Sequence, residues 1–521
     1  MQSDPNFGMQ QPEDGSEANK GIKQKREEFI KNTRRELRRD LINSKRYANP
    51  QTEGPKCEFS LSHLDHLPNK DFLAKKITEW NALAPRVDQL LHFFTCIESQ
   101  DILEQHYGII GLRRILSQKT NLPIQEVLDH NVLTKIINMA QNDVQPHLQM
   151  EATWCLANLA SGTTEQTNSL IQKGVIPIFV ELSKSNSYQI AEQAIWGLGN
   201  ISGDCVEFRS LVLKSNAVDV LNDVFDRTNN IKMKEQIIWV FSNICRLRPE
   251  NESFSGYMKR MVSKLIEVFT ETNDAEVQDD CLFGFCKCAK SSCIELFANE
   301  RFLHKLALLY NSYFNNVEMN RHRISACSSV IGGLTSSNNY HTMLVVNSGF
   351  LRLLCIVLSF KEESLVKEAC WVLSNIAIGE DDQVRAVLTE PGLFDKIMLL
   401  VHSSNEEISK EAIWILCNMC LSKNYDNIKY LIEQGGLLQI FKENLNLNGD
   451  SRKITLIFEA LIQLITFFEN YRDERNVNPF VSTLIEKGIA EKIEEMQYHK
   501  SDVIYIKALN ILEQYFDLSD S

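Results

Sequence analysis

The chain has 521 residues, of which 44% are hydrophobic and 24% are charged, and its formal net charge is −13. With only 22 glycines and 12 prolines, it has too few turn-forming residues for a β-sandwich, barrel or propeller, so we expect long helices joined by short connections. The negative charge argues against a general nucleic-acid binder and against a protein that binds anionic membranes.

The first 19 residues are polar and acidic, and we expect them to be disordered. They contain no apolar segment of the kind that forms a signal peptide. No stretch of about 18 apolar residues occurs in the chain, so we also expect no membrane span. The cysteines are scattered, mostly within apolar helical segments, which favours a reducing setting such as the cytosol or the nucleus.

Residues 20–49 form a strongly basic arm. Between residues 20 and 46 the chain has eleven basic and four acidic side chains, a net charge of +7 that leaves −20 for the remainder. Because apolar residues are sparse there, we expect the arm to be disordered, or to form a helix that is not stable alone. Such asymmetry is typical of a tail that binds an acidic partner or a nucleic acid; the alternative is a solvated charged helix. We expect residues 50–75 to be a linker.

The rest of the chain, residues 76–515, contains an internal repeat marked by a tryptophan and, four residues later, an asparagine. Successive tryptophans are separated by 42, 43 and 43 residues, and one gap of 132 residues leaves room for two further units, centred on Leu282 and Ser328. A helical period of this length is typical of armadillo or HEAT repeats, so we predict an all-α superhelical solenoid of about ten armadillo repeats. The five pairs are Trp154–Asn158, Trp196–Asn200, Trp239–Asn243, Trp371–Asn375 and Trp414–Asn418.

The phase of these helices places the tryptophan and asparagine away from the core. At about 100° per residue from Trp154, Asn158 lies at about 40°, whereas Leu156 and Leu159 lie at about 200° and about 140°. The aliphatic residues therefore share one face, and the tryptophans and asparagines share the opposite one. We expect the five pairs to form a ladder along one surface of the stack.

The residue types in this ladder indicate its ligand. An asparagine amide has both donors and an acceptor, so it can bind the backbone of an extended peptide without reading its sequence. Neighbouring indoles form slots for the aliphatic stem and cationic end of Lys or Arg. Carboxylates near the pairs would complement the cations, so we expect an extended Lys- and Arg-rich peptide as ligand. These carboxylates are Glu192, Asp204, Glu368 and Glu411.

We find no sequence motif of an enzyme, a nucleotide-binding loop or a metalloprotease. A cluster of four cysteines between Cys281 and Cys293 lacks the spacing of a zinc site, and Cys417 and Cys420 lie within one repeat helix. We therefore expect no enzyme activity, no cofactor and no metal. Two alternatives to a peptide-binding adaptor are an armadillo scaffold of structural or signalling type and an RNA-binding solenoid, the second of which is disfavoured by the −20 body.

Together these features resemble the importin-α (karyopherin-α) family of nuclear import adaptors. The resemblance rests on the arm KREEFIKNTRRELRRDLINSKRY, on the stretches ASGTTEQT and GNISGD, and on the ladder. It implies a protein that shuttles between cytoplasm and nucleus, binds nuclear localisation signals of cargo, and leaves the nucleus with an export receptor and Ran-GTP. The arm would bind importin-β and, when free, occupy the groove and inhibit it, and scaffolds of the alternative class need neither arm nor ladder.

The resemblance also assigns residues, including a lysine pocket made of the Gly162 carbonyl, the Thr167 hydroxyl and the Asp204 carboxylate. The major signal-binding site would be Trp154, Asn158, Gly162, Thr167, Glu192, Trp196, Asn200, Asp204, Trp239 and Asn243. The minor site would be Glu368, Trp371, Asn375, Glu411, Trp414 and Asn418. The arm would act through Lys25, Arg26, Arg34, Arg35, Arg38, Arg39, Lys45 and Arg46.

The chain departs from the family pattern in its second half. Leu282 and Cys286 stand where the family has Trp and Tyr, and Ser328 and Gly332 stand in place of an Arg–Asn pair. The minor-site lysine pocket, which the family pattern writes as TGTDEQT, is TSSNNYHT here. The acidic C-terminal cluster that helps the export receptor bind is also reduced, to Glu469, Asp473 and Glu474.

Overall fold

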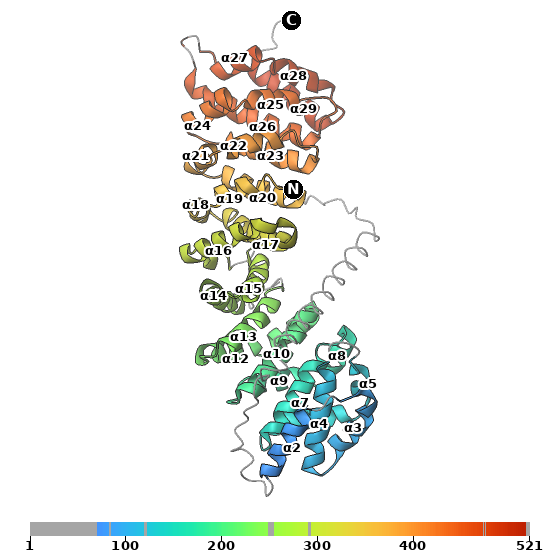
Figure 1. The fold of residues 1–521 in the computed structure, drawn as a ribbon. Coiled ribbons are helices and arrows are strands. Elements are labelled where there is room, and N and C mark those ends of the chain that lie inside the picture. Colours follow the sequence, from blue (N-terminus) through green and yellow to red (C-terminus); the bar gives the residue numbers. More distant parts are fainter. Residues whose placement is uncertain are drawn as a thin grey trace, which may run out of the picture. The chain divides into compact units, whose positions relative to one another are not determined.

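A computed structural model describes residues 70–82, 85–118, 122–247, 255–289, 293–472, 474 and 476–516. The predicted acidic N-terminus, the basic arm and most of the predicted linker lie outside these residues. The first described helix, α2 (Lys70–Ala82), begins five residues before the expected end of the linker at residue 75. Within the described part of the chain every regular element is a helix (Figure 1), which confirms the expected all-α fold.

The chain divides into two compact units, Met1–Val240 and Phe241–Ser521. The helices of unit 1 that follow α2 are η2 (Val87–Gln89), α3 (Leu90–Glu98), α4 (Ile102–Leu116), α5 (Ile124–Asp129), α6 (Val132–Gln141), α7 (Pro146–Leu159), α8 (Thr164–Gln172), α9 (Val175–Leu182), α10 (Tyr188–Asp204), α11 (Val206–Lys214) and α12 (Ala217–Arg227). Helix α13 (Ile231–Ile244) contains the boundary between the units.

The described helices of unit 2 are α14 (Ser255–Glu271), α15 (Ala275–Cys288), η4 (Ile294–Phe297), α16 (Glu300–Tyr313), η5 (Phe314–Asn316), α17 (Val317–Thr335), α18 (Asn339–Asn347), α19 (Phe350–Val357), α20 (Glu363–Ala377), α21 (Asp381–Thr389), α22 (Leu393–Leu400), α23 (Glu406–Met419), α24 (Tyr425–Lys429), η6 (Tyr430–Gln434), α25 (Leu437–Asn444), α26 (Ser451–Phe468), η7 (Glu469–Tyr471), α27 (Pro479–Glu486), α28 (Ala490–Glu495), η8 (Met496–Tyr498) and α29 (Asp502–Tyr515).

From α5 onwards most helices recur as a triplet of a first, a second and a longer third helix. The first and second helices of several triplets are joined by one residue in the left-handed conformation, which glycine adopts without strain. This explains where some of the few glycines are used. The joining residues, with their φ angles, are Gly174 (80°), Asn216 (63°), Gly349 (81°), Gly392 (72°) and Gly436 (64°).

The core of each unit runs through the stack between the helices. Most of the second helices place a phenylalanine in it, and complete burial of such a side chain is worth about 1.5–3 kcal/mol. The third helices add the small and aliphatic residues of their inner face, and Leu156 and Leu159 of α7 are fully buried, as their helical phase predicts. The fully buried phenylalanines include Phe179, Phe225, Phe269, Phe302, Phe350 and Phe441.

The two repeats that lack the tryptophan and asparagine each have a second and a third helix among the described residues, α14 and α15 in one and α16 and α17 in the other. Leu282 lies on α15 and Ser328 on α17, and both are buried. The Ser328 hydroxyl is within 2.7 Å of the Tyr310 hydroxyl of α16, so the small residue leaves room for a buried tyrosine. The repeat therefore runs through both altered units, as the sequence period predicts.

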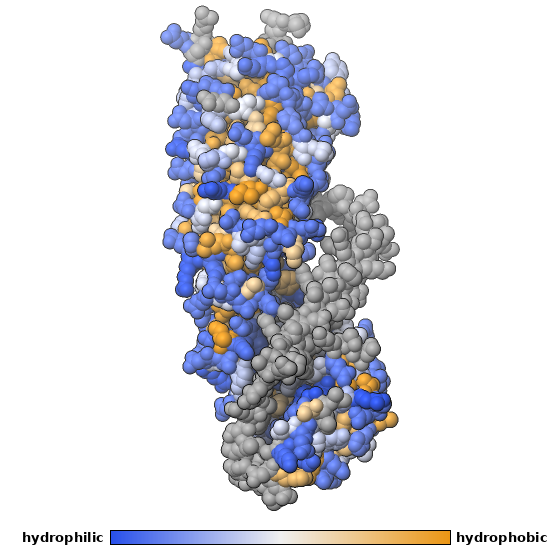
Figure 2. Space-filling model, viewed as in Figure 1, coloured by the Kyte–Doolittle hydropathy of each residue, from blue (hydrophilic) through white to orange (hydrophobic). Residues whose placement is uncertain are grey.

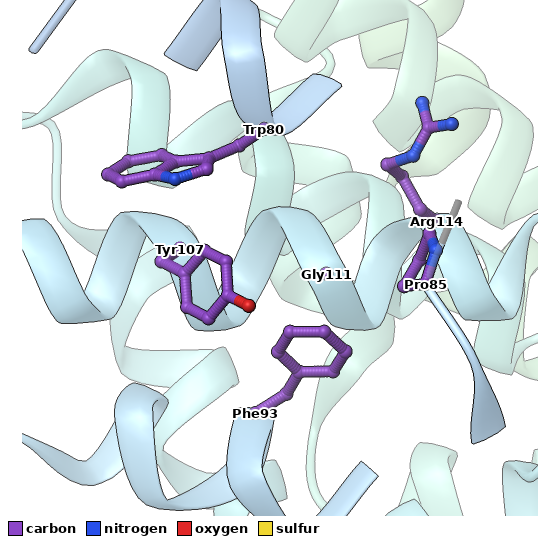
Figure 3. Close-up of a pocket in the computed structure, with 6 residues that line it drawn as sticks. All are labelled: Trp80, Pro85, Phe93, Tyr107, Gly111 and Arg114. Atoms are coloured by element: carbon purple, nitrogen blue, oxygen red, sulfur yellow. The ribbon is translucent and has the colours of Figure 1, made fainter. Parts of the chain in front are cut away.

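A small apolar cavity lies near the start of the described chain, among α2, α3 and α4 (Figure 3). The Tyr107 ring lies between Trp80 and Phe93, with ring centroids 5.6 and 5.5 Å away. A Cβ at Gly111 would come within 2.3 Å of the Phe93 ring, so this glycine lets the ring approach the helix. We interpret the cavity as a gap in aromatic packing.

One helical stretch of the described residues, Ser451–Tyr471, is long and apolar enough to cross a membrane by length and composition alone. Its residues Ile457, Leu461 and Leu464 are fully buried within unit 2, as in the core helix of a repeat stack. The expected absence of a membrane span remains a prediction.

Candidate peptide-binding site

The first three predicted rungs lie on the third helices α7, α10 and α13, and Asn243 of the third rung lies beyond the boundary of unit 1. The indoles are less open than the helical phase predicts: Trp154 is half-buried, and Trp196 and Trp239 are only 7% exposed. For Trp239 the cause is a glycine of the preceding repeat. A Cβ at Gly199 would lie 2.2 Å from Cζ3 of Trp239, so the indole lies directly against the backbone of α10.

The ladder asparagines connect each repeat to the one before it. The Asn200 amide donates to the carbonyl of Ala157 at 2.9 Å, and the Asn158 amide donates to the Ser117 hydroxyl at 3.1 Å. In unit 2 the Asn418 amide donates to the carbonyl of Ser374 at 2.9 Å. Because an asparagine amide has two N–H groups and a carbonyl oxygen, one such bond leaves it capable of binding a peptide backbone. These side chains therefore connect successive repeats, and they are less open than the helical phase predicts: Asn158 and Asn418 are 5% and 9% exposed, and Asn200 is half-buried.

The predicted lysine pocket is built around the first turn of α8. Thr163 caps this helix in a reciprocal capping box with Gln166, which fixes the loop that contains Gly162. The Thr167 hydroxyl is buried and donates to the Ala160 carbonyl at 3.4 Å. The contact to Asp204 is made instead by Thr164, whose hydroxyl donates to Oδ1 of that carboxylate at 2.8 Å.

Asp204 is the last residue of α10 and is 2% exposed. The Nη2 group of Arg209 donates to its backbone carbonyl at 3.5 Å. Sequence reasoning missed Thr164, because the family match directs attention to Thr167 and nothing in the local pattern separates the two threonines.

Glu192, the other predicted carboxylate of unit 1, lies one turn before Trp196 and is half-buried. Its Oε1 atom accepts from the Tyr188 hydroxyl on its own helix and from the Gln236 amide of α13, each at 3.4 Å. Burial and the Glu192 charge raise the pKa of Tyr188. Glu192 thus joins two successive third helices at the edge of the ladder.

A further rung precedes Trp154 and was missed by the sequence analysis. Arg113 lies on α4, 41 residues before Trp154, and its guanidinium lies 4.5 Å from the indole centroid. Its Nε and Nη2 groups also donate to the Glu151 carboxylate, at 2.7 and 3.3 Å. The signal was available, since Arg113 and Ser117 have the spacing of a ladder pair.

Two buried histidines lie beside this ion pair. His106 and His147 are stacked with ring centroids 5.2 Å apart, and Nε2 of His147 lies 3.8 Å from Oε1 of Glu151. Burial lowers the pKa of His106 to about 4 and that of His147 to about 3. Both rings are therefore neutral at pH 7, and the nearby Arg113 charge further disfavours protonation of His147.

The two rungs of unit 2 differ from each other. Trp371 of α20 is half-buried, because a Cβ at Gly332 would lie 2.0 Å from its Cζ3. Glu368, one turn earlier, accepts from the Ser325 hydroxyl at 2.8 Å. Trp414 of α23 is 47% exposed, which is the open indole that the helical phase predicts. Glu411, one turn earlier, is half-buried, and burial raises its pKa.

The eight predicted arm residues, Lys25, Arg26, Arg34, Arg35, Arg38, Arg39, Lys45 and Arg46, lie outside the described residues. Of the reduced acidic cluster, Glu469 accepts hydrogen bonds from Arg472 at 2.6 Å and from Asn478 at 2.7 Å.

Among the described residues the cysteines are free thiols, and no group of three or more His, Cys, Asp or Glu is placed to hold a metal ion. The expected absence of cofactor and metal remains a prediction.

Comparison with known proteins places this geometry in a family context. The model of the armadillo/beta-catenin-like repeat matches residues 120–161, 163–203 and 338–378, and that of the atypical Arm repeat matches residues 478–521. Importin subunit alpha-1b of Oryza sativa subsp. japonica is 29% identical over 444 residues, which cover 84% of this chain and 80% of the relative. Importin subunit alpha-3 of Arabidopsis thaliana is 29% identical over 435 residues, 82% of this chain and 80% of the relative.

A crystal structure of an engineered protein has the same fold, with a TM-score of 0.62 at 20% identity, covering 82% of this chain and 98% of that one. Together with the repeat models, this confirms the armadillo architecture. The matches to importin-α subunits confirm the resemblance that the arm and the ladder predict.

Proposed function

We propose that this chain, which belongs to the importin-α family, is a nuclear import adaptor that binds Lys- and Arg-rich localisation signals of cargo in its ladder. Its relatives are named as importin subunits. In the proposed role the chain makes and breaks no covalent bond. It holds an extended peptide by side-chain contacts and passes the assembly to importin-β through its N-terminal arm.

The observation that carries this proposal is the position of Asp204. The carboxylate lies one turn beyond Asn200 and two turns beyond Trp196 on α10, and Thr164 of the preceding repeat holds one of its oxygens. A lysine that reached this carboxylate would have the ladder amides beside its backbone and an indole beside its stem. A charge-assisted bond at such a buried site is about twice as strong as a neutral one.

Electrostatics supports the same ligand class. Outside the segment 20–46 the chain has a charge of −20, and that segment has a charge of +7. A basic peptide is therefore attracted to the body, and the arm competes for the same attraction. In this proposal importin-β captures the arm, which removes the competitor and favours cargo binding. The proposed shuttling then requires an export receptor and Ran-GTP as further partners.

The groove is tested by replacing Asp204 with asparagine, which keeps an acceptor for Thr164 and removes the charge. We expect a monopartite Lys-rich peptide to bind about 30- to 150-fold more weakly, equivalent to about 2–3 kcal/mol. Asp223→Asn, an exposed site on α12, makes the same charge change and serves as the control. Unchanged affinity in Asp204→Asn, with circular dichroism equal to that of the parent, would refute the pocket.

The arm is tested separately. A pulldown with residues 1–60 as bait is expected to retain importin-β, and the chain that lacks residues 1–49 is expected to bind the same Lys-rich peptide more tightly than the full chain. Equal affinities of the two chains would reject autoinhibition, while leaving the groove assignment untouched.

A further inference from the structure

The surface beside the ladder changes character between the two units. Three residues after the ladder asparagines, unit 1 has Ser161 and Gly203, Arg246 follows Asn243 near the unit boundary, and the last two rungs of unit 2 have Ile378 and Leu421. These two aliphatic side chains follow the ends of α20 and α23 and are 56% and 43% exposed. With the exposed Trp414 they form what we call the apolar lane. Figure 2 shows hydrophobic residues gathered on the visible face of unit 2, over the region of α20 and α23.

The carboxylate and the hydroxyl of the predicted lysine pocket occupy opposite positions in the two units. In unit 1, Thr164 donates to Asp204 of the next repeat. In unit 2, Ser422 occupies the position of Asp204, four residues after the ladder asparagine, and Asp381 occupies the position of Thr164. The hydroxyl of Ser422 donates to Oδ1 of Asp381 at 2.7 Å. The donor and the acceptor have thus changed places.

The Asp381 carboxylate forms hydrogen bonds that stabilise the fold. Oδ1 of Asp381 also accepts from the backbone N–H groups of Lys423 and Asn424, at 2.8 and 3.2 Å. It therefore orders the turn between α23 and α24, and the place of the lysine-binding acid in unit 2 is taken by a hydroxyl. A lysine at this point of a bound peptide would meet the Ser422 hydroxyl, and the Asp381 carboxylate beside it already accepts three hydrogen bonds from the fold.

One cation slot is retained in unit 2, between Glu411 and Trp414. The two side chains are one helical turn apart on α23, so they share a face. Lys367, whose charge acts on Glu411, donates to Glu407 instead, at 2.8 Å. Glu411 accepts no hydrogen bond from any described residue, and its partial burial raises its pKa, so an incoming cation would relieve a desolvated charge.

We propose that unit 2 binds a different class of peptide from unit 1, a proposal that rests on the proposed function. The peptide is an extended segment in which a single Lys or Arg contacts Trp414 and Glu411 and aliphatic side chains contact Ile378 and Leu421. Packed helices lie about 8–10 Å apart and an extended chain advances about 3.3 Å per residue. Neighbouring repeats therefore take side chains about three residues apart.

Two labelled peptides of equal length test this proposal by fluorescence anisotropy with the full chain. The first has lysines at every anchor position, and the second has a single lysine and two leucines three residues apart, for the successive repeats that contain Ile378 and Leu421. The variant is Ile378→Ser with Leu421→Ser, both exposed sites. Leu399→Ser on α22, which is 72% exposed, is the matched control in the same unit.

We expect the double variant to lose at least about tenfold in affinity for the leucine–lysine peptide and less than about twofold for the all-lysine peptide, with Leu399→Ser unchanged for both. Glu411→Gln should also weaken the leucine–lysine peptide. No loss in the double variant, or an equal loss for both peptides, would overturn the inference. If the all-lysine peptide still binds in an Asp204-dependent way, only this inference fails; if neither peptide binds the parent chain, the proposed function fails with it.

Discussion

The contact between Gly199 and Trp239 gives a sharp test of how the ladder is built. A methyl group at position 199 would lie 2.2, 2.5 and 2.7 Å from three carbons of the indole, whereas carbon atoms prefer separations of about 3.5–4.0 Å. In Gly199→Ala the ring must therefore move by about 1.3 Å or more, away from a site where it is 7% exposed. Overpacking of this kind costs about 1–3 kcal/mol.

Because the chain has two compact units, its unfolding need not be two-state, and a local measurement is preferable. Hydrogen exchange of the α10 and α13 segments should accelerate about 5- to 150-fold in Gly199→Ala, which corresponds to that cost. Peptide affinity at the first unit should fall as well, since Trp239 is a proposed rung. The control is Gly256→Ala on α14, where an added Cβ meets no atom within 4 Å and where we expect no loss. Exchange and affinity that stay unchanged in Gly199→Ala would refute this packing of Trp239.

Two further predictions concern pH. Burial raises the pKa of Glu411 above its ordinary value of 4.5, so ionised Glu411 destabilises the fold at neutral pH, and this penalty disappears as the pH falls below about 4.5. In urea denaturation, Glu411→Gln should therefore be more stable than the parent at pH 7 but not at pH 4. An equal difference in stability at both pH values would contradict the assignment. Burial lowers the pKa of His106 and His147 to about 4 and about 3, so the folded state binds fewer protons than the unfolded chain below pH 6.5. Stability should then decline towards pH 4 by up to about 1.4 kcal/mol per pH unit for each histidine. His106→Leu should reduce that slope, and a slope identical to the parent would exclude His106 as a cause.

The fold could be predicted because its signals are periodic along the chain. The spacing of about 43 residues identifies the third helices, and the helical phase around Trp154 correctly assigns Leu156 and Leu159 to the core. The period also located the two altered units, where Leu282 and Ser328 lie on helices as expected. Each of these inferences depends either on the helical phase within one helix or on the repeat period along the chain, and a single sequence shows both.

The details of the site depend on contacts between repeats, which leave no local signal. Helical phase alone places Trp196 and Trp414 alike, yet their exposures are 7% and 47%. The exposure of an indole depends on what the neighbouring repeat presents to it, as Gly199 shows for Trp239 and Gly332 shows for Trp371. The partner of Asp204 was likewise unpredictable, because it lies 40 residues away in sequence.

The asparagine bonds between successive repeats have a mechanical consequence. Since the amides of Asn158 and Asn200 each hold the end of the preceding third helix, they help to set the angle between neighbouring repeats within the unit. A ligand that engages these amides therefore acts on the joints of the stack as well as on its surface. By thermodynamic reciprocity, any ligand that favours one curvature is itself bound more tightly when the stack adopts that curvature. When one of these bonds between repeats is altered, the affinity of the stack for its ligand and its elasticity should accordingly change together.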